Sequence, residues 1–165
     1  MKYPKFLNNE STLGVVALSA GVGDNLEEYK RSIFHLEERF NVIETASVRN
    51  VGERPASGKI RAEELDKLVV DKDVDMIMCA SGGDFLYEIL PYVNLENIAN
   101  NPKWYMGASD PTSLLYLITT SCDIATLYGF NAHSYGQEEL DKAQIVSLDY
   151  INGNINKQDS YLMYE

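Results

Sequence analysis

Short apolar runs alternate with helix-periodic stretches along nearly the whole chain. Five of these runs are brief, continuous and bounded by polar residues or glycine, which is typical of strands buried on both faces. The expected strands are residues 13–19, a strand beginning at Val42-Ile43, and residues 75–80, 103–107 and 124–128. The expected helices are residues 24–40, 59–70, 94–100, 110–121 and 137–151, and one after Asp84 that carries Phe85, Leu86, Ile89 and Leu90.

The order of these elements predicts the fold class. Strand and helix alternate five times, which indicates an α/β fold with three layers, α/β/α, around a mainly parallel, doubly wound sheet of flavodoxin-like style. In such sheets ligands bind at the carboxyl ends of the strands. The loops that should carry a site are therefore residues 19–24, 80–84, 107–111 and 129–136.

A length of 165 residues fits one domain. We expect residues 1–151 to form this domain. Residues 152–165 are polar and then aromatic, and they resemble a linker toward a further domain. The aromatic stretch Tyr161-Leu162-Met163-Tyr164 could also drive self-association into a homodimer.

Composition excludes some classes of partner. Acidic residues outnumber basic ones by 25 to 14, which gives a formal net charge of -11. No basic cluster offers a footprint for a phosphate backbone, so nucleic acid is not an expected partner. The chain shows neither a signal-peptide pattern nor an apolar stretch long enough to span a bilayer. We therefore expect a soluble cytoplasmic protein with no membrane partner.

Cysteine and glycine patterns argue against a cofactor. Cys79 and Cys122 lie in apolar surroundings, which fits a reducing compartment better than a disulfide framework. Cysteine and histidine show no metal-ligand spacing, so no metal is expected. Gly21-Val22-Gly23 follows a strand as in a dinucleotide-binding loop, but Leu26 stands where the third glycine of that motif belongs.

The strongest candidate for chemistry is the segment Gly107-Ala108-Ser109-Asp110-Pro111. A strand ends at Gly107, and a helix should start at once, with Asp110 as its N-cap and Pro111 at its first position. Ser109 would then occupy a tight strand-to-helix turn, the geometry of a nucleophile elbow, with the N–H of Asp110 free for an oxyanion. An ordinary capped turn has the same residues, and on spacing alone it is the commoner case.

A second glycine turn, Ser81-Gly82-Gly83-Asp84, follows another expected strand. Paired glycines let a backbone approach a ligand closely and present its N–H groups. This turn could supply a second oxyanion donor. Taken by itself, a simple tight turn is the commoner case.

Five motifs in order resemble the N-terminal domain of the LD-carboxypeptidases and microcin-immunity-type serine peptidases, family S66. The resemblance covers nearly the whole chain. The motifs are Ser57-Gly58-Lys59-Ile60-Arg61-Ala62, Ser81-Gly82-Gly83-Asp84, Leu90-Pro91, Asn101-Pro102-Lys103 and Gly107-Ala108-Ser109-Asp110.

The resemblance implies a Ser–His–Glu triad that cleaves an amide next to a free carboxylate, typically in peptidoglycan peptides that link L- and D-centres. It implies that Ser109 is the nucleophile and that the N–H groups of Asp110 and Gly83 form the oxyanion hole. The family takes its Glu and His from a C-terminal domain, which this sequence lacks. Two departures are Ala108, where the family has an aromatic or similar residue, and Gly129-Phe130-Asn131, where it commonly has Gly-Pro.

Other residues offer weaker candidates for a base or nucleophile. His35 and His133 are the two histidines. His35 falls in the middle of an expected helix, whereas His133 lies in a loop at the expected edge of the sheet and could reach Ser109. Cys79 at a strand end could be a nucleophile of the amidotransferase type, but a buried structural cysteine is the commoner case.

Two function classes therefore remain open. In the first, the chain is the N-terminal half of a serine carboxypeptidase, inactive alone, whose partners are a peptide with a free carboxylate and the missing C-terminal domain. In the second, it is an α/β binding module that has kept the fold without the reaction.

Overall fold

The computed structural model describes residues 1–155 and 157, and it contains a five-stranded, wholly parallel sheet of order β2-β1-β3-β4-β5. The strands are β1 (Thr12–Val16), β2 (Asn41–Glu44), β3 (Met76–Cys79), β4 (Trp104–Gly107) and β5 (Leu127–Tyr128). This is the flavodoxin-like strand order, and the direction of winding reverses between β1 and β3. The expected α/β fold is confirmed.

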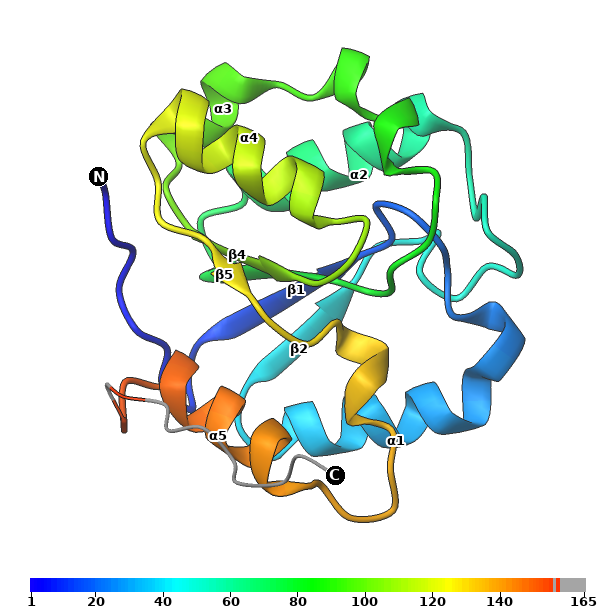
Figure 1. Ribbon diagram of the computed structural model, residues 1–165, viewed down its shortest axis with the longest axis vertical. Helices are drawn as coiled ribbons and strands as arrows, with labels where there is room; N and C mark the ends of the chain where they lie inside the picture. The colour runs from blue at the N-terminus through cyan, green and yellow to red at the C-terminus, as the bar shows by residue number, and fades with distance from the viewer. Residues whose placement is uncertain (156, 158–165) are drawn as a thin grey trace, which may run out of the picture.

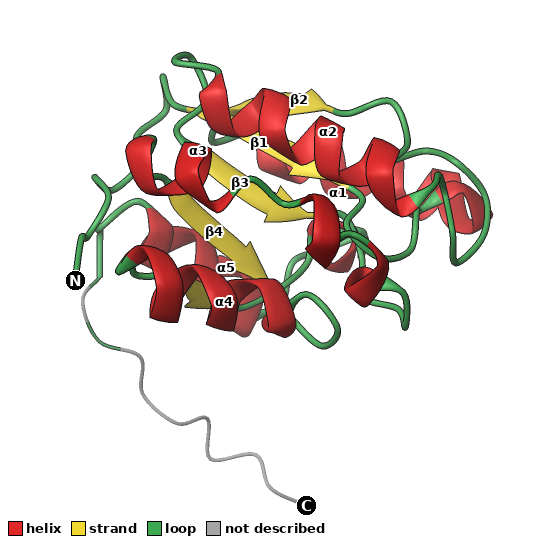
Figure 2. Cartoon of the chain, turned by 90° about the horizontal axis from the view of Figure 1, so that it is seen from above, coloured by secondary structure: helices red, strands yellow, loops and turns green. Residues whose placement is uncertain are grey.

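Helices cover both faces of the sheet (Figures 1 and 2). One face carries α2 (Gly58–Val70), α3 (Leu95–Asn100) and α4 (Thr112–Cys122), and the other carries α1 (Leu26–Glu37) and α5 (Lys142–Ile151). Successive strand residues point to opposite faces. In and just after β1, Leu13, Val15 and Ala17 accordingly join the apolar core on the α1 side, while Val16 and Leu18 join the core under α2 and α4.

Two elements differ from the sequence-based expectation. The fifth strand pairs with β4 only over Leu127–Tyr128, because Ile124 forms a bridge with Lys2 near the N-terminus instead. After Asp84 the chain forms two short 3-10 turns, η2 (Leu86–Glu88) and η3 (Leu90–Tyr92), in place of an α-helix. Pro91 explains the break, since it has no N–H to continue an α-helical ladder.

The helix boundaries show how capping shifts an end. A 3-10 turn, η1 (Gly23–Asn25), precedes α1, which ends three residues before Phe40. The last helix begins at Lys142, later than the expected residue 137, because Asp141 and Gln144 form a capping box there. Before it, residues 132–135 form the 3-10 turn η4 (Ala132–Tyr135), which packs against α1. Within the described residues no helix has the length and apolar character needed to cross a bilayer.

Candidate active site

Ser109 lies where the sequence places it, just past the carboxyl end of β4 and before α4. Its backbone has a φ of 65°, and its side chain is exposed. A β-carbon is disfavoured in this left-handed region, so such a conformation persists only where the surroundings impose it. The strand, strained serine and helix together have the form of a nucleophile elbow.

The start of α4 corrects one detail of the sequence analysis. The helix begins at Thr112, and the Asp110 side chain does not cap it. The first turn is closed by backbone bonds instead, with the Thr112 N–H 2.9 Å from the Ser109 carbonyl. The Asp110 carboxylate turns toward other segments, where it accepts the Ser19 hydroxyl at 2.5 Å and the Leu86 N–H at 2.8 Å.

The glycine turn after β3 lies beside the elbow, as expected for loops that follow parallel strands. A β-carbon built on Gly82 would be 3.4 Å from Cβ of Ser109 and 3.6 Å from its Oγ. Gly83 has a φ of 135°, which a residue with a side chain rarely adopts. The structure thus brings Ser109, Asp110 and Gly83 together at one edge of the sheet.

The backbone N–H groups of Asp110 and Gly83 are available to a ligand. Neither N–H has a hydrogen-bond partner anywhere in the described part of the chain. Buried or half-buried N–H groups are nearly always paired in folded proteins. Unpaired donors gather at this edge of the sheet beside the exposed serine, since within the described residues partners are likewise absent for the N–H groups of Ser81, Gly82, Asp84 and Ser109.

Asn131 is a site residue that the sequence analysis did not single out. Its buried side chain accepts the Ala108 N–H at 3.0 Å and donates to the Ala108 carbonyl at 3.3 Å. This amide therefore mimics a neighbouring strand and fixes the residue before Ser109. The available signal was its place in the 129–136 loop, which the topology directs to the site edge.

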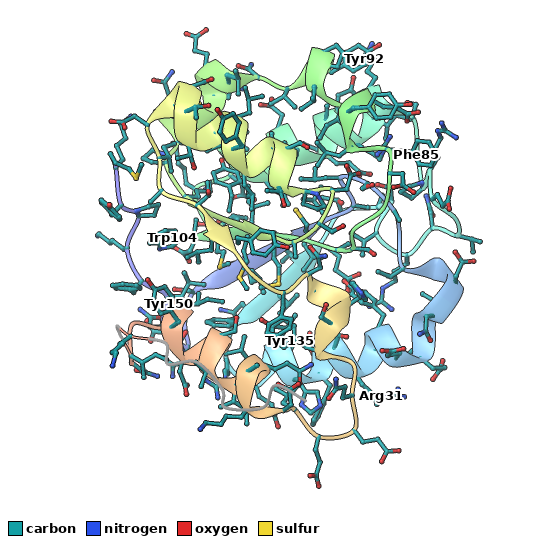
Figure 3. The ribbon with its side chains drawn as sticks, viewed as in Figure 1. Arg31, Phe85, Tyr92, Trp104, Tyr135 and Tyr150 are labelled. Atoms are coloured by element: carbon teal, nitrogen blue, oxygen red, sulfur yellow. The ribbon has the colours of Figure 1, made fainter. Side chains whose placement is uncertain are left out.

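Arg61 is the largest fully buried side chain and lies beneath the site. Its guanidinium donates to the carbonyls of Leu18 at 2.6 Å and Phe85 at 3.2 Å, and to the Glu88 carboxylate at 2.6 Å. Burial lowers the pKa of Arg61, and the Glu88 carboxylate acts against that shift. Figure 3 shows Phe85 at the end of the molecule opposite Trp104, the first residue of β4.

Neither histidine contacts Ser109 among the described residues. Nδ1 of His133 lies 3.1 Å from the Ala80 carbonyl, and the ring lines a hollow of about 130 Å³ together with Ser81. His35 lies on α1, with Nε2 3.2 Å from the Gln137 carbonyl. The described part of the chain therefore offers no base already paired with the Ser109 hydroxyl.

Cys79 has the environment of a structural cysteine. It is buried at the end of β3, and a β-carbon on the neighbouring Gly107 would lie 2.9 Å from its sulfur. Burial, with the Asp110 carboxylate as a smaller cause, raises the pKa of the Cys79 thiol from 9.0 to about 12. Because the thiolate is the reactive species, this cysteine is not a nucleophile near neutral pH.

In the described ranges no three His, Cys, Asp or Glu side chains gather to hold a metal.

We predict that Cys79 resists thiol reagents until the chain unfolds. A raised pKa in the folded state means that the neutral thiol contributes stability below pH 9.0, and that this contribution is lost as the pH rises toward about 12. Labelling by a thiol-reactive chromophore should therefore be slow in native mildly alkaline buffer and fast in denaturant. A Cys122→Ser variant isolates the signal of Cys79, and rapid native labelling of that variant would contradict the assignment.

Comparison with known proteins defines the family. The model of the LD-carboxypeptidase N-terminal domain, peptidase family S66, matches residues 13–129. The match includes the glycine turn and the elbow. The chain therefore belongs to this family of peptidases, as its motifs indicate.

Individual relatives agree with the family match. The microcin C7 self-immunity protein MccF of Escherichia coli is 38% identical over 76 residues, which are 46% of this chain and 22% of the relative. A solved MccF structure with adenosine monophosphate covers 100% of this chain and 51% of its own, at 26% identity and a TM-score of 0.86. An MccF-like protein from Streptococcus pneumoniae is 28% identical over 89% of this chain and 46% of its own, with a TM-score of 0.71. The chain spans about half the length of these solved relatives.

Proposed function

We propose that this chain is the nucleophile-bearing half of a serine carboxypeptidase. The observation that carries the proposal is the exposed Ser109 at a φ of 65°, beside two N–H groups without a protein partner, those of Asp110 and Gly83. A strained serine and unpaired donors both cost free energy of folding. A function that uses them together explains why both occur at one point of the sheet edge.

The chemistry follows from acyl transfer. The Ser109 hydroxyl attacks the amide carbonyl of the substrate while a base removes its proton. The resulting oxyanion accepts hydrogen bonds from the N–H groups of Asp110 and Gly83. The tetrahedral species collapses to an ester on Ser109 as the amine leaves with a proton. Water then hydrolyses the ester and regenerates the serine.

The base belongs to a second domain under this proposal. A serine hydroxyl is a weak nucleophile until an adjacent base takes its proton. His133 is held by the Ala80 carbonyl, and His35 lies against Gln137, so neither is placed for that role. The family resemblance assigns the His and Glu to a C-terminal domain, and this chain spans about half of the solved MccF chain.

For the substrate we propose a peptide amide next to a free carboxylate. The family name supports an L,D-linked peptide, and the resemblance implies one of the peptidoglycan type. A related conjugate is the second class to test, because one MccF structure was solved in complex with aspartyl sulfamoyl adenosine. Both classes present an acyl group to the same serine and oxyanion donors.

The test is turnover by two forms of the protein. In the first form the chain is purified alone. In the second, called the completed enzyme below, residues 1–151 are fused to the C-terminal half of MccF. We expect no hydrolysis of an L,D-linked peptide by the chain alone, and hydrolysis by the completed enzyme, measured by release of the terminal amino acid.

Two results would argue against the proposal. Robust turnover by the isolated chain would mean that it carries its own base, and His133 would be the first residue to replace. A well-folded fusion that hydrolyses neither substrate class would favour the alternative of a binding module that has kept the fold without the reaction.

A further inference from the structure

A hydrogen-bonded pair of side chains, one buried and one half-buried, joins the loop after β1 to the elbow of the candidate site. Ser19, in the loop after β1, is fully buried, and its hydroxyl lies 2.5 Å from Oδ2 of Asp110. Asp110 belongs to the elbow after β4, 91 residues further along the chain. The sequence pattern predicts a capping role for Asp110 and no role for Ser19, so this pairing is a feature of the folded chain.

The same pair also holds the segment that follows the glycine turn. Oδ2 of Asp110 accepts the N–H of Leu86 at 2.8 Å, and Oγ of Ser19 accepts the N–H of Phe85 at 3.1 Å. The Ala20 N–H donates to the Gly82 carbonyl at 3.0 Å. The ends of β1, β3 and β4 are therefore tied together by a few short hydrogen bonds.

Gly83 rests directly on Ser19. A β-carbon built on Gly83 would lie 2.5 Å from Oγ of Ser19, so the backbone at this point approaches the hydroxyl too closely for any side chain. The position of the Gly83 N–H thus depends on where Ser19 holds the turn. The Asp110 N–H is tied to the same hydroxyl through its own side chain.

Protein donors solvate the Asp110 carboxylate in this arrangement. The Asp110 carboxylate would oppose a nearby oxyanion if it were unpaired, but two donors share its Oδ2. The Arg61 guanidinium adds a cation beneath the loop, donating to the Ser19 carbonyl at 3.2 Å. Charge-assisted hydrogen bonds of this kind are among the stronger ones in proteins, which suits a fixed geometry.

We propose that Ser19 and the Asp110 carboxylate are positioning residues that set the spacing between the Asp110 and Gly83 N–H groups. This inference rests on the proposed function, since the spacing matters only if both groups bind an oxyanion. Neither side chain takes part in the reaction itself. Their effect is to keep both donors at one distance from the Ser109 hydroxyl.

The first experiment uses the chain alone and needs no activity. NMR is used to measure the chemical shifts of the Asp110 and Gly83 amides and the exchange rate of the Phe85 amide proton. The measurements are made in the wild type, in Ser19→Ala and in Ser47→Ala. Ser47 is a matched control, because it is also buried and its hydroxyl also donates to a carboxylate, that of Glu64. We expect Ser19→Ala to shift the Asp110 and Gly83 amide signals and to speed exchange of the Phe85 amide, which loses its acceptor, and Ser47→Ala to leave all three unchanged.

The second experiment measures kcat and KM in the completed enzyme. Displacing catalytic donors by a fraction of an ångström is expected to lower kcat about tenfold to a hundredfold, with KM changed by less than about twofold. Asp110→Asn keeps the acceptor oxygen for Ser19 and Leu86, so its loss should be smaller than that of Ser19→Ala. A purely structural role would lower the melting temperature in both serine variants without this selective fall in kcat.

The two experiments separate the positioning role of Ser19 and Asp110 from the proposed carboxypeptidase function. If the Asp110 and Gly83 amides respond no more to Ser19→Ala than to Ser47→Ala, the positioning role is refuted, whatever the activity. If they respond but kcat in an active completed enzyme is unchanged, the role is also refuted. If the completed enzyme is inactive from the start, the proposed function fails, and the NMR result still decides whether Ser19 fixes the two turns.

Discussion

Replacing Ser109 by alanine is expected to lower kcat of the completed enzyme by about 10⁴-fold or more, which is typical for loss of a serine nucleophile. The alanine keeps the backbone, so the Asp110 and Gly83 N–H groups can still bind the carbonyl oxygen. Substrate binding should therefore persist while acylation stops. The measurement is single-turnover hydrolysis of an L,D-linked peptide, with substrate affinity determined separately by calorimetry.

Ser113→Ala is the matched control for this variant. Ser113 is an exposed serine in the first turn of α4, four residues beyond Ser109. Its hydroxyl has no partner among the described residues, so its loss should leave kcat within about twofold, as is usual for surface substitutions. Equal activity of Ser109→Ala and Ser113→Ala would end the nucleophile assignment.

Ser109→Gly adds a test of the backbone strain. Glycine adopts a φ of 65° without steric cost, whereas alanine retains the clash of a β-carbon. Ser109→Gly should therefore be as inactive as Ser109→Ala but more stable, by up to about 1 kcal/mol in the free energy of unfolding. A lower stability of the glycine variant in urea unfolding would show that the elbow is not strained.

The main strands were predictable because each buried strand is visible in the sequence as a continuous apolar run. Met76–Cys79 and Trp104–Gly107 are continuous apolar runs, and runs of this kind are what a sheet covered on both faces requires. The turn at Ser109 was predictable for a similar reason, since a glycine, a serine and Asp-Pro follow one such run directly. Because the strands are parallel, the turn at Ser109 and the glycine turn of residues 81–84 were both expected at the same edge of the sheet.

The errors come from contacts between residues far apart in the chain. Residues 124–126 lie outside the β4 ladder because Ile124 pairs with Lys2. Asp110 does not cap α4 because its carboxylate is taken by Ser19 and Leu86. Local capping preferences cannot anticipate a partner that only the folded sheet brings near, and the same holds for Asn131 with Ala108. The aromatic stretch 161–164 lies outside the described residues, so its role remains a prediction.

Among the substitutions proposed above and below, Arg61→Met is expected to lower the free energy of unfolding the most. Arg61 and Arg54 share one carboxylate, since Arg61 lies 2.6 Å from Oε2 of Glu88 and Arg54 lies 2.7 Å from its Oε1. Their surroundings differ, because the Arg61 side chain is 0% exposed and that of Arg54 is 55% exposed. The pair therefore compares a buried with an exposed guanidinium on the same acceptor.

Arg61→Met should destabilise the fold by about 1–3 kcal/mol for each buried carbonyl that loses its donor, while Glu88 keeps Arg54 as its partner. Methionine fills much of the space but leaves the carbonyls of Leu18 and Phe85 without their donor in the interior. Arg54→Ala should cost no more than about 1 kcal/mol, because an exposed pair is screened by water.

Equilibrium unfolding in urea measures these differences, and a double-mutant cycle of Arg61→Met with Glu88→Gln separates the ion pair from the carbonyl contacts. A large coupling energy would assign the loss to the ion pair with Glu88. A small coupling energy beside a large single-variant loss would assign it to the carbonyls, which close the loops after β1 and β3 around the site. If Arg61→Met cost no more than Arg54→Ala, the buried guanidinium would not be what holds these loops in place. The rigidity of the site would then depend on the other hydrogen bonds between its loops, among them the bond of Ser19 to Asp110.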